Sequence, residues 1–465
     1  MKHFIEICIT LLVMAILSGC DTGKEEREET VTTGELDATR MVTMGNSLTA
    51  GIMDGGWTYD GLRHSYATQI ARQIYGDGRV GDDPAEHQFL LGRIKEPGNP
   101  VPATIDNIEQ IGVYEDGSPV YDFDITPPEN RLEDDALRVE NYNAEPNFNN
   151  LAVPGFMGLD VLHTYTPVNA LDRVNPFFSL PLRDRGSQYN QALQIDPTFV
   201  ILWVGNNEAL GSALSGGVVG PYPPEDESGF PAPGFRSVLQ QLLEPYGDGD
   251  TKIIMGTVPD VTSIPFVTEV GVATDEGVRA YIAGTPGDPD EVWSDTLTFY
   301  GQAPEGIVRP VLASEYVLLD WLLMDPFSQE PVIGLHPDHP LPDSLWLSGS
   351  QLEEIGGAVD AYNNIIMEAA DQSDNIVVAD INEFFNSVLS NGGIDGFEMG
   401  LFGGLFSLDG VHPNKVGHAY IANEFIQVLN NEFGAQIATL NPEEYVTDSP
   451  FHQGRIALIR DLLLN

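Results

Sequence analysis

The chain has 465 residues, of which 42% are hydrophobic and 9% aromatic, so it can bury a sizeable core in one enlarged domain or in two. It carries 70 acidic but only 21 basic residues, and its formal net charge is −49. A surface this negative repels nucleic acid and anionic membranes, and we therefore exclude nucleic acid as a partner. Acid-rich composition with few lysines is typical of halophilic proteins, in which salt screens the self-repulsion.

Two N-terminal segments are predicted to lie outside the folded domain. Residues 1–19 resemble a signal peptide, because their apolar run, 7–17, is too short to span a bilayer. The run ends in "LSGC", which resembles a bacterial lipobox and implies cleavage before Cys20 and lipidation of its thiol; a plain signal peptide with a chance cysteine is the alternative. Residues 20–38 are polar and charged and are predicted to form a flexible acidic tether. We expect an exported lipoprotein, anchored to a membrane only through this lipid, in the periplasm or at the cell surface.

The chain contains two cysteines, and they are not expected to pair. Cys8 lies in the segment predicted to be removed, and Cys20 would carry the lipid. We therefore expect no disulfide, so that the exported protein must be stabilised by core packing alone. The same count excludes thiol catalysis and cysteine-bound zinc.

Four apolar segments are predicted to form the strands of a buried sheet. They are near-continuous runs rich in valine and isoleucine, which is typical of strands covered on both faces in a parallel sheet. The four segments are 41–45, 198–205, 251–258 and 375–381. Amphipathic patterns predict helices at 66–74, at 352–366 and after Pro413. This alternation predicts an α/β fold, a three-layer α/β/α sandwich.

Three long stretches interrupt this alternation and are rich in proline, glycine and aspartate. They lie near 76–147, 211–235 and 260–350. Loops this long inside a compact domain are usually functional lids or small subdomains, so we expect each stretch to be an insertion. The final segment, 436–465, ends in the apolar sequence "RIALIRDLLLN" and is predicted to dock on the domain.

The segment "GNSL", 45–48, follows the first predicted strand and contains Ser47. A serine in this position is a candidate nucleophile, although "GNS" is also ordinary turn chemistry. A nucleophilic serine needs a base that accepts its proton. The other motifs of the chain decide between the two interpretations.

The sequence "DGVHPN", 409–414, supplies such a base. Asp409 and His412 are three residues apart, ahead of a helix that Pro413 can begin. An imidazole can accept the serine proton, and a carboxylate can fix its tautomer and stabilise the imidazolium. Ser47, His412 and Asp409 are therefore the candidate catalytic residues.

Two further segments offer hydrogen-bond donors for an oxyanion. The segment "ILWVGNNEAL", 201–210, ends a predicted strand and places Asn207 at its carboxyl edge. The segment "NNLAVPGFMG", 149–158, offers the backbone N–H of Gly155. Ligands of open α/β sheets bind at the carboxyl ends of strands, where Ser47 would also lie. The N–H groups of Ser47 and Gly155 and the Asn207 amide would form an oxyanion hole with three donors.

These four pieces, in this order, resemble the SGNH (GDSL) hydrolase family, and the resemblance covers most of the chain. The segment "GNSL" is similar to the first family block, with Asn46 where aspartate is usual. Gly155 in "NLAVPG" matches the second block, and "GNNE", 205–208, matches the third, with Glu208 in place of aspartate. The segment "DGVH", 409–412, matches the fifth block. Neither departure removes a catalytic group.

The resemblance implies a flavodoxin-like parallel sheet of about five strands within a hydrolase domain at 39–435. It implies hydrolysis of esters through an acyl-enzyme intermediate, without a cofactor. It assigns the catalytic roles to the serine, aspartate and histidine named above, and the oxyanion hole to Ser47, Gly155 and Asn207. The substrate would be a small-molecule, lipid or carbohydrate ester, and the sequence gives no sign of an obligate protein partner.

Two alternatives to a general esterase or lipase remain open. They are a carbohydrate O-acetyl esterase and a non-catalytic, surface-binding lipoprotein that retains the fold. Four aromatic residues near the motifs are candidates for an acyl pocket or for the core: Trp57, Phe156, Trp203 and Phe266. The histidines at 64, 163 and 418 are expected on helix surfaces or in the core.

Metal sites are weakly indicated. His336 and His339 lie beside Asp338, but no further strong ligand is near in sequence, so a polar loop is favoured. The acid–glycine runs at 76–83 and 246–252 resemble calcium-binding loops but lack the acidic residue that closes an EF-hand. We therefore expect turns there and no bound metal.

Overall fold

The structure is a computed structural model of the chain. It describes residues 31–96, 98, 104–113, 119–126, 140–141, 143–163, 179–183, 185–247, 249–275, 298–303, 306–324, 331–401 and 404–446. The predicted signal peptide, Cys20 and the first part of the predicted tether lie outside these residues, as does the end of the C-terminal segment. Within the described part of the chain, no helix is both long enough and apolar enough to cross a membrane.

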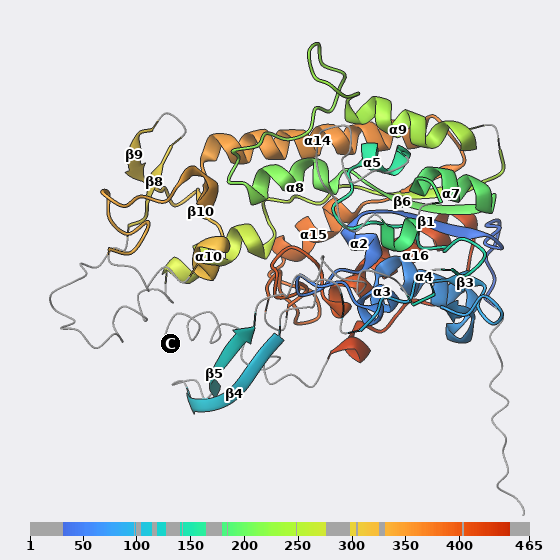
Figure 1. The fold of residues 1–465 in the computed structure, drawn as a ribbon, viewed down its shortest axis with the longest axis horizontal. Helices are drawn as coiled ribbons and strands as arrows, with labels where there is room; N and C mark the ends of the chain where they lie inside the picture. The colour runs from blue at the N-terminus through green and yellow to red at the C-terminus, as the bar shows by residue number, and fades with distance from the viewer. Residues whose placement is uncertain are drawn as a thin grey trace, which may run out of the picture.

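Among the described residues, a parallel sheet of four strands lies at the centre of the fold (Figure 1). Its strands are, in spatial order, β1 (Met41–Gly45), β6 (Phe199–Trp203), β7 (Lys252–Gly256) and β12 (Ile376–Ala379). Each neighbouring pair is parallel. Every residue of β1 and β6 is buried, which explains their continuous apolar sequence. The structure confirms the predicted mixed α/β class and the parallel sheet.

An irregular segment, 149–153, runs beside β1 at the edge of this sheet. The N–H of Thr43 donates to the carbonyl of Asn149 at 2.8 Å, and the carbonyl of Thr43 accepts from the N–H of Leu151 at 3.0 Å. This is the bonding pattern of a parallel neighbour. The segment therefore extends the hydrogen bonding of the sheet beyond β1 and leads into the turn that contains Gly155.

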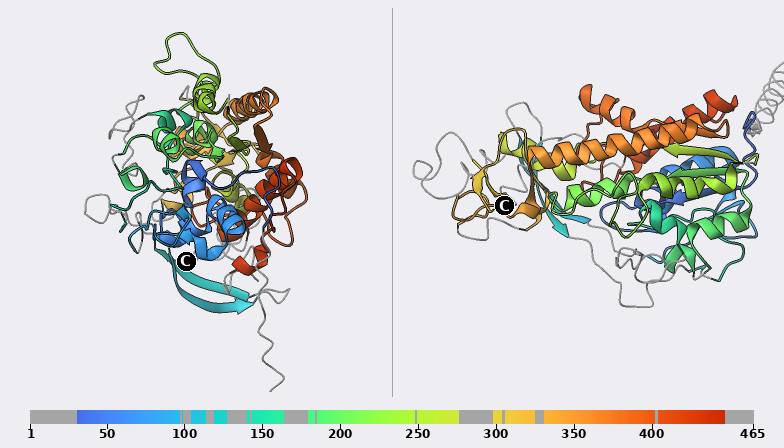
Figure 2. Two further views of the ribbon diagram at one scale, coloured as in Figure 1. Left: turned by 90° about the vertical axis from the view of Figure 1, so that its right-hand side faces the viewer. Right: turned by 90° about the horizontal axis from the view of Figure 1, so that it is seen from above.

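Helices cover both faces of the sheet (Figure 1; Figure 2). On one face, α4 (Tyr66–Tyr75) and α16 (Lys415–Phe433) pack together. On the other face lie α5 (Gly158–Leu162), α9 (Phe235–Leu243) and α14 (Gly349–Asp371). The helices predicted from amphipathic patterns are α4, α14 and α16, so the apolar stripes read from the sequence do face the sheet.

Shorter elements connect these parts. Between β1 and β6 the chain forms α2 (Ser47–Ala50), α3 (Tyr59–His64), β2 (Val80–Gly81), β3 (Phe89–Leu90), β4 (Thr104–Val113), β5 (Pro119–Thr126), α6 (Ser179–Leu182) and α7 (Gln188–Ile195). After β6 and β12 it forms α8 (Asn206–Leu214) and α15 (Ile381–Ser390). Short 3₁₀ turns lie at Asp77–Arg79, Glu244–Tyr246, Asp343–Leu345 and Pro442–Tyr445. Within the predicted insertion at 76–147, β4 and β5 pair as an antiparallel hairpin.

The stretch predicted as an insertion at 260–350 has a small core of its own. Its elements are α10 (Pro265–Asp275), β8 (Tyr300–Gln302), β9 (Val308–Pro310), β10 (Tyr316–Val317), α13 (Asp320–Leu323) and β11 (Trp346–Leu347). Buried residues of these and neighbouring turns form a second hydrophobic cluster that includes Phe299, Trp321 and Trp346. The N–H of Phe266 in α10 donates to the carbonyl of Gly410 at 2.9 Å. This stretch therefore packs against the loop that carries Asp409 and His412.

The segment after α16 returns along that helix. The Asn430 side chain donates to the carbonyl of Ile437 at 2.9 Å and accepts from the N–H of Ile437 at 2.8 Å. The Asn423 side chain makes the same pair of bonds with Leu440, at 3.0 and 2.7 Å. These bonds hold the beginning of the predicted docking segment on α16. The apolar end of that segment lies outside the described residues.

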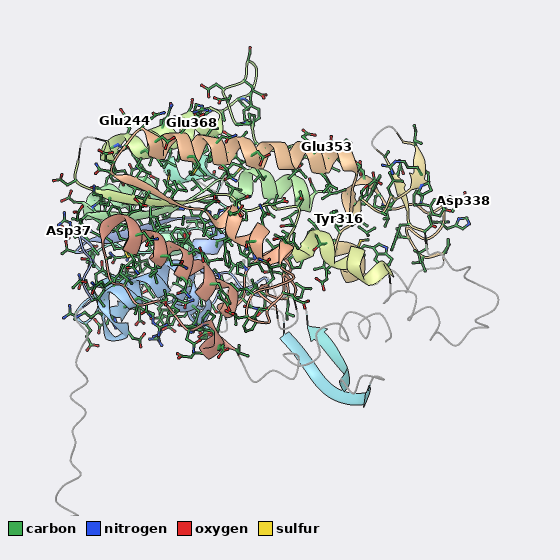
Figure 3. All side chains as sticks on the ribbon, turned by 180° about the vertical axis from the view of Figure 1, so that it is seen from behind. Asp37, Glu244, Tyr316, Asp338, Glu353 and Glu368 are labelled. Carbon is green, nitrogen blue, oxygen red and sulfur yellow. The ribbon has the colours of Figure 1, made fainter. Side chains whose placement is uncertain are left out.

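Acidic side chains lie exposed on widely separated parts of the surface. Figure 3 labels Asp37, Glu244, Asp338, Glu353 and Glu368, all of which are exposed. They come from the N-terminal segment, the turn after α9, the 260–350 insertion and α14. The excess negative charge is therefore spread over the surface, where dissolved salt can screen it.

Candidate active site

Ser47 lies at the point where β1 meets α2. Asn46 caps this helix, because its side-chain oxygen accepts from the N–H of Leu48 at 3.2 Å. Gly51 ends the helix with φ of +76°, and a Cβ at this position would lie 2.3 Å from the carbonyl oxygen of Gly61. The candidate nucleophile is thus fixed at the carboxyl end of a buried strand, and its residue is 7% exposed.

The Gln188 side chain binds the backbone at the end of β1, and the sequence patterns did not indicate this residue. Its side-chain oxygen accepts from the N–H of Gly45, and its side-chain nitrogen donates to the carbonyl of Gly45, both at 2.9 Å. Gln188 is fully buried, so water does not compete for these bonds. They join residues 143 positions apart, and no local sequence pattern indicates such a contact.

Asp409 and His412 form a hydrogen-bonded pair. His412 Nδ1 lies 2.8 Å from Asp409 Oδ2, and the same oxygen accepts from the N–H of Gly55 at 2.7 Å. Asp409 Oδ1 accepts from the N–H groups of Val411 and His412 at 2.9 and 2.8 Å. Burial alone would raise the pKa of Asp409, but the charge of His412 and these hydrogen bonds outweigh burial and lower the pKa to about 2. The carboxylate is therefore ionised at neutral pH and can orient the imidazole.

Ser47, Asn207 and His412 line one cavity of about 550 Å³, part of which is open to solvent. Much of the remaining wall is apolar. It includes Leu210, Val261, Ile264, Phe385, Met399 and Phe406. The structure thus brings the candidate nucleophile, the candidate base and the candidate oxyanion amide to one largely apolar cavity.

Asn207 is the second residue of α8, which follows β6 after the short connection 204–205. Its side-chain nitrogen donates to the carbonyl of Phe156 at 2.8 Å. An amide nitrogen carries two N–H groups, so a second donor remains for an oxyanion. The neighbouring Glu208 is buried and accepts from the N–H of Gly158 at 2.6 Å. The longer acid at this position therefore ties α8 to the segment that also holds Asn207.

Gly155 lies in the turn between the edge segment 149–153 and α5. Its φ is +77°, a conformation that favours glycine. It is exposed and is not among the described residues that line the cavity. Its neighbour Phe156 holds the Asn207 amide. The structure therefore brings Gly155 next to the residue that positions Asn207, but not to the cavity wall itself.

The remaining candidates from the sequence differ in where they lie relative to the cavity. Trp203 is buried and also lines the cavity, whereas Trp57, Phe156 and Phe266 are buried and are not among its described lining residues. In the part of the chain that the structure describes, no three His, Cys, Asp or Glu side chains are placed to hold a metal ion. The stretch around His336 is an exposed turn.

Comparison with known proteins does not assign the chain to a family. The chain matches no protein-family model, no curated protein and no solved structure. A function for this protein is therefore inferred from the geometry of the site and from the motifs of the sequence.

Proposed function

We propose that the protein is a serine hydrolase of carboxylic esters of the SGNH type, with Ser47 as the nucleophile. The observation that carries this proposal is the cavity lined jointly by Ser47, His412 and Asn207. The hydrogen bond of 2.8 Å between His412 and Asp409 supports it, because a base in this role needs a carboxylate that fixes its tautomer.

We also propose that the fold is the flavodoxin-like three-layer sandwich of that family. In space, the order is the edge segment 149–153, β1, β6, β7 and β12. In the chain, the edge segment comes second, after β1. The spatial order is therefore 2-1-3-4-5 in chain numbering, which is the order of flavodoxin-like sheets and supports this proposal. Ser47 follows β1 and Asn207 follows β6, at the carboxyl ends where such sheets bind their ligands.

In the proposed reaction, His412 accepts the proton of Ser47 Oγ as this oxygen attacks the ester carbonyl carbon. Asp409 stabilises the imidazolium that forms. The Ser47 N–H and the second N–H of the Asn207 amide stabilise the tetrahedral oxyanion. His412 then gives its proton to the leaving alcohol, and a water molecule that His412 deprotonates hydrolyses the acyl-enzyme.

The cavity wall favours esters with an apolar group beside the scissile bond. An O-acetylated sugar would place hydroxyl groups against side chains such as Val261, Ile264 and Phe406, which offer them no hydrogen bonds. An acyl chain would instead bury apolar surface there. We therefore favour carboxylic esters with apolar acyl groups over carbohydrate O-acetyl esters.

The proposed lipid anchor is argued from the sequence alone, because Cys20 lies outside the described residues. Incorporation of labelled palmitate by the expressing cells tests it. Label that is lost in Cys20→Ala supports lipidation, and an unlabelled wild-type protein contradicts it.

Hydrolysis of p-nitrophenyl esters from acetate to palmitate tests the enzymatic proposal. The measurements compare the wild type with Ser47→Ala, at low and at multimolar salt. We expect turnover that Ser47→Ala abolishes and an optimum at an intermediate or long acyl chain. A folded wild-type sample that neither turns over these esters nor reacts with a fluorophosphonate would contradict the proposal and favour a non-catalytic binding lipoprotein.

A further inference from the structure

A tight turn follows the helix that carries Ser47. Met53 and Gly56 pair through two backbone hydrogen bonds, at 3.1 and 2.9 Å. Between them, Asp54 and Gly55 have φ values of +53° and +68°. Positive φ at both central residues is the mark of a type I′ turn, for which Asp-Gly is a favoured sequence.

Three hydrogen bonds join this turn to the loop that carries Asp409, and we call them the clasp. The N–H of Asp54 donates to Ser407 Oγ at 2.9 Å, and Asp54 Oδ1 accepts from the N–H of Leu408 at 2.9 Å. The N–H of Gly55 donates to Asp409 Oδ2 at 2.7 Å, the oxygen that also bonds the imidazole. The clasp therefore acts directly on the carboxylate of the candidate catalytic pair.

The same segment is tied to the nucleophile helix. The N–H of Ile52 donates to the carbonyl of Ser47 at 3.1 Å. The indole Nε1 of Trp57 donates to the carbonyl of Ala50 at 2.9 Å, and Trp57 is 2% exposed. Residues 47–57 thus form one short unit, with the nucleophile at one end and the clasp near the other.

We propose that the clasp holds Asp409 and His412 in register with Ser47, and that Asp54 is a positioning residue of the active site. The kinetic consequences of this inference rest on the proposed hydrolase function. The inference itself concerns the Asp409–His412 bond, which can be observed without turnover. A misplacement of about 1 Å in a reacting group can lower a rate about 100-fold, so a small displacement of this loop has a measurable effect.

Asp54 also places a second carboxylate beside the pair. The pKa of Asp54 is raised above its usual value, and burial is the largest cause. The charge of Asp409 adds to this effect, and the hydrogen bond from Leu408 opposes it. Among the described residues, Asp409, His412 and Lys415 are the titratable groups that face it. Asp54→Asn removes the charge but keeps an oxygen that can accept from Leu408. This variant therefore separates the electrostatic effect of Asp54 from its hydrogen bonding.

A second Asp-Gly turn provides a matched control. Ile394 and Phe397 pair through two backbone bonds of 2.8 Å, and between them Asp395 and Gly396 have φ values of +49° and +92°. Asp395 is exposed, and its carboxylate accepts from the hydroxyl of Tyr420 at 2.8 Å. Substitution of Asp395 thus perturbs the same turn type away from the catalytic pair.

The kinetic test uses the full mature protein and its variants. We expect Asp54→Ala to lower kcat, and the rate at which a fluorophosphonate labels Ser47, by about 10- to 100-fold with little change in KM. Asp54→Asn should recover most of kcat, because its side-chain oxygen can still accept from the N–H of Leu408. Asp395→Ala should change neither quantity. An unchanged kcat in Asp54→Ala, or an equal loss in Asp395→Ala, overturns the proposal.

The downfield proton resonance of the His412 imidazole reports the bond to Asp409 independently of turnover. We expect this resonance in the wild type, Asp54→Asn and Asp395→Ala, and expect it broadened or lost in Asp54→Ala. An unchanged resonance in Asp54→Ala overturns the clasp. If the wild type proves inert to esters and to fluorophosphonate, the hydrolase proposal fails while this resonance still tests the clasp. If Asp54→Ala does not fold, Ser407→Ala replaces it in the test, because it removes a different bond of the clasp. We expect Ser407→Ala to weaken the His412 resonance in the same way but to a smaller extent. A resonance that is unchanged in Ser407→Ala counts against the proposal.

Discussion

Two histidines close together in the chain, His412 and His418, lie in opposite environments. His412 lines the cavity and bonds the half-buried carboxylate of Asp409 at 2.8 Å. His418 lies within α16 and is fully buried, and its Nδ1 accepts from the N–H of Tyr66 at 3.3 Å. Its Nε2 has no hydrogen-bond partner among the described residues. The same residue type is thus equipped for proton transfer in one place and packed as an apolar ring in the other.

The difference lies in the partners of the two rings. Burial lowers the pKa of His418 to about 3, and the charges of His412 and His64 act in the same direction. Among the described residues, no carboxylate contributes to this shift, and the ring instead stacks on Tyr66 with 6.4 Å between centroids. A neutral, enclosed imidazole cannot exchange protons with a substrate, so we propose a role in stability for His418 and keep the proposed catalytic role for His412.

Replacement of His412 gives the largest expected effect. We expect His412→Ala to lower kcat/KM for p-nitrophenyl esters by at least about 1,000-fold, because the serine loses its base. The melting temperature should change little, since His412 lies at a cavity wall. Steady-state kinetics and calorimetry on the same samples check both statements. Retained activity would remove His412 from the mechanism.

Replacement of His418 should show the reverse pattern. His418→Ala leaves a void in the core and removes the acceptor of the Tyr66 N–H. We expect a loss of about 2–4 kcal/mol in the free energy of unfolding. Fluorophosphonate labelling of the folded fraction should stay near the wild-type rate. Denaturant unfolding at constant salt measures the first quantity, and a large loss of labelling without a loss of stability would reverse the two assignments.

The sequence predicts those contacts of the site that join residues close together in the chain. Asp409 and His412 are three residues apart, so their pairing was predictable from a short motif. The strand at 41–45 was predictable because both of its faces are buried, which leaves an uninterrupted apolar run. By contrast, the clasp bond from Gly55 to Asp409 joins residues 354 positions apart. The Gln188 contact with Gly45 is equally non-local, and a single sequence carries no periodic signal for either.

Irregular structure is the second feature that could not be predicted from the sequence. The segment 149–153 lies beside β1 at the edge of the sheet. It is too polar, and its regular pairing with β1 is too short, for the sequence to predict a strand there. The stretch 260–350 was predicted only as an insertion, because its small core is assembled from residues scattered between Val270 and Trp346. Contacts of this kind follow from the tertiary arrangement and not from local propensity.

The pH dependence of stability reports on the environment of His418. The folded state holds His418 neutral down to about pH 3, whereas an unfolded chain protonates histidine near pH 6.5. The unfolded state therefore binds more protons between these values, and stability falls as the pH is lowered through this window. The slope from one such group is at most about 1.4 kcal/mol per pH unit.

His418→Gln keeps an acceptor for Tyr66 but has no titrating group, so we expect a shallower slope between pH 6.5 and 3. His339→Gln, at an exposed loop position, is the matched control. Below pH 3.8, all three proteins should lose further stability as Asp409, with its pKa lowered to about 2, becomes protonated. Urea unfolding at fixed ionic strength gives the slopes. Identical slopes in wild type and His418→Gln would show that His418 does not control this window.

The smallest expected effect comes from the residue that lies between the two regions. Tyr66 stacks on His418, and its hydroxyl lies 2.9 Å from Thr49 Oγ1 in the helix that begins with Ser47. Tyr66→Phe keeps the ring but removes this hydrogen bond, so we expect a loss of about 1 kcal/mol in the free energy of unfolding. Labelling of Ser47 should keep its wild-type rate, because Gln188 holds the end of β1 independently. A fall in labelling as large as that expected for Asp54→Ala would mean that the packed histidine region tunes the nucleophile, and the division of roles between His412 and His418 would then have to be abandoned.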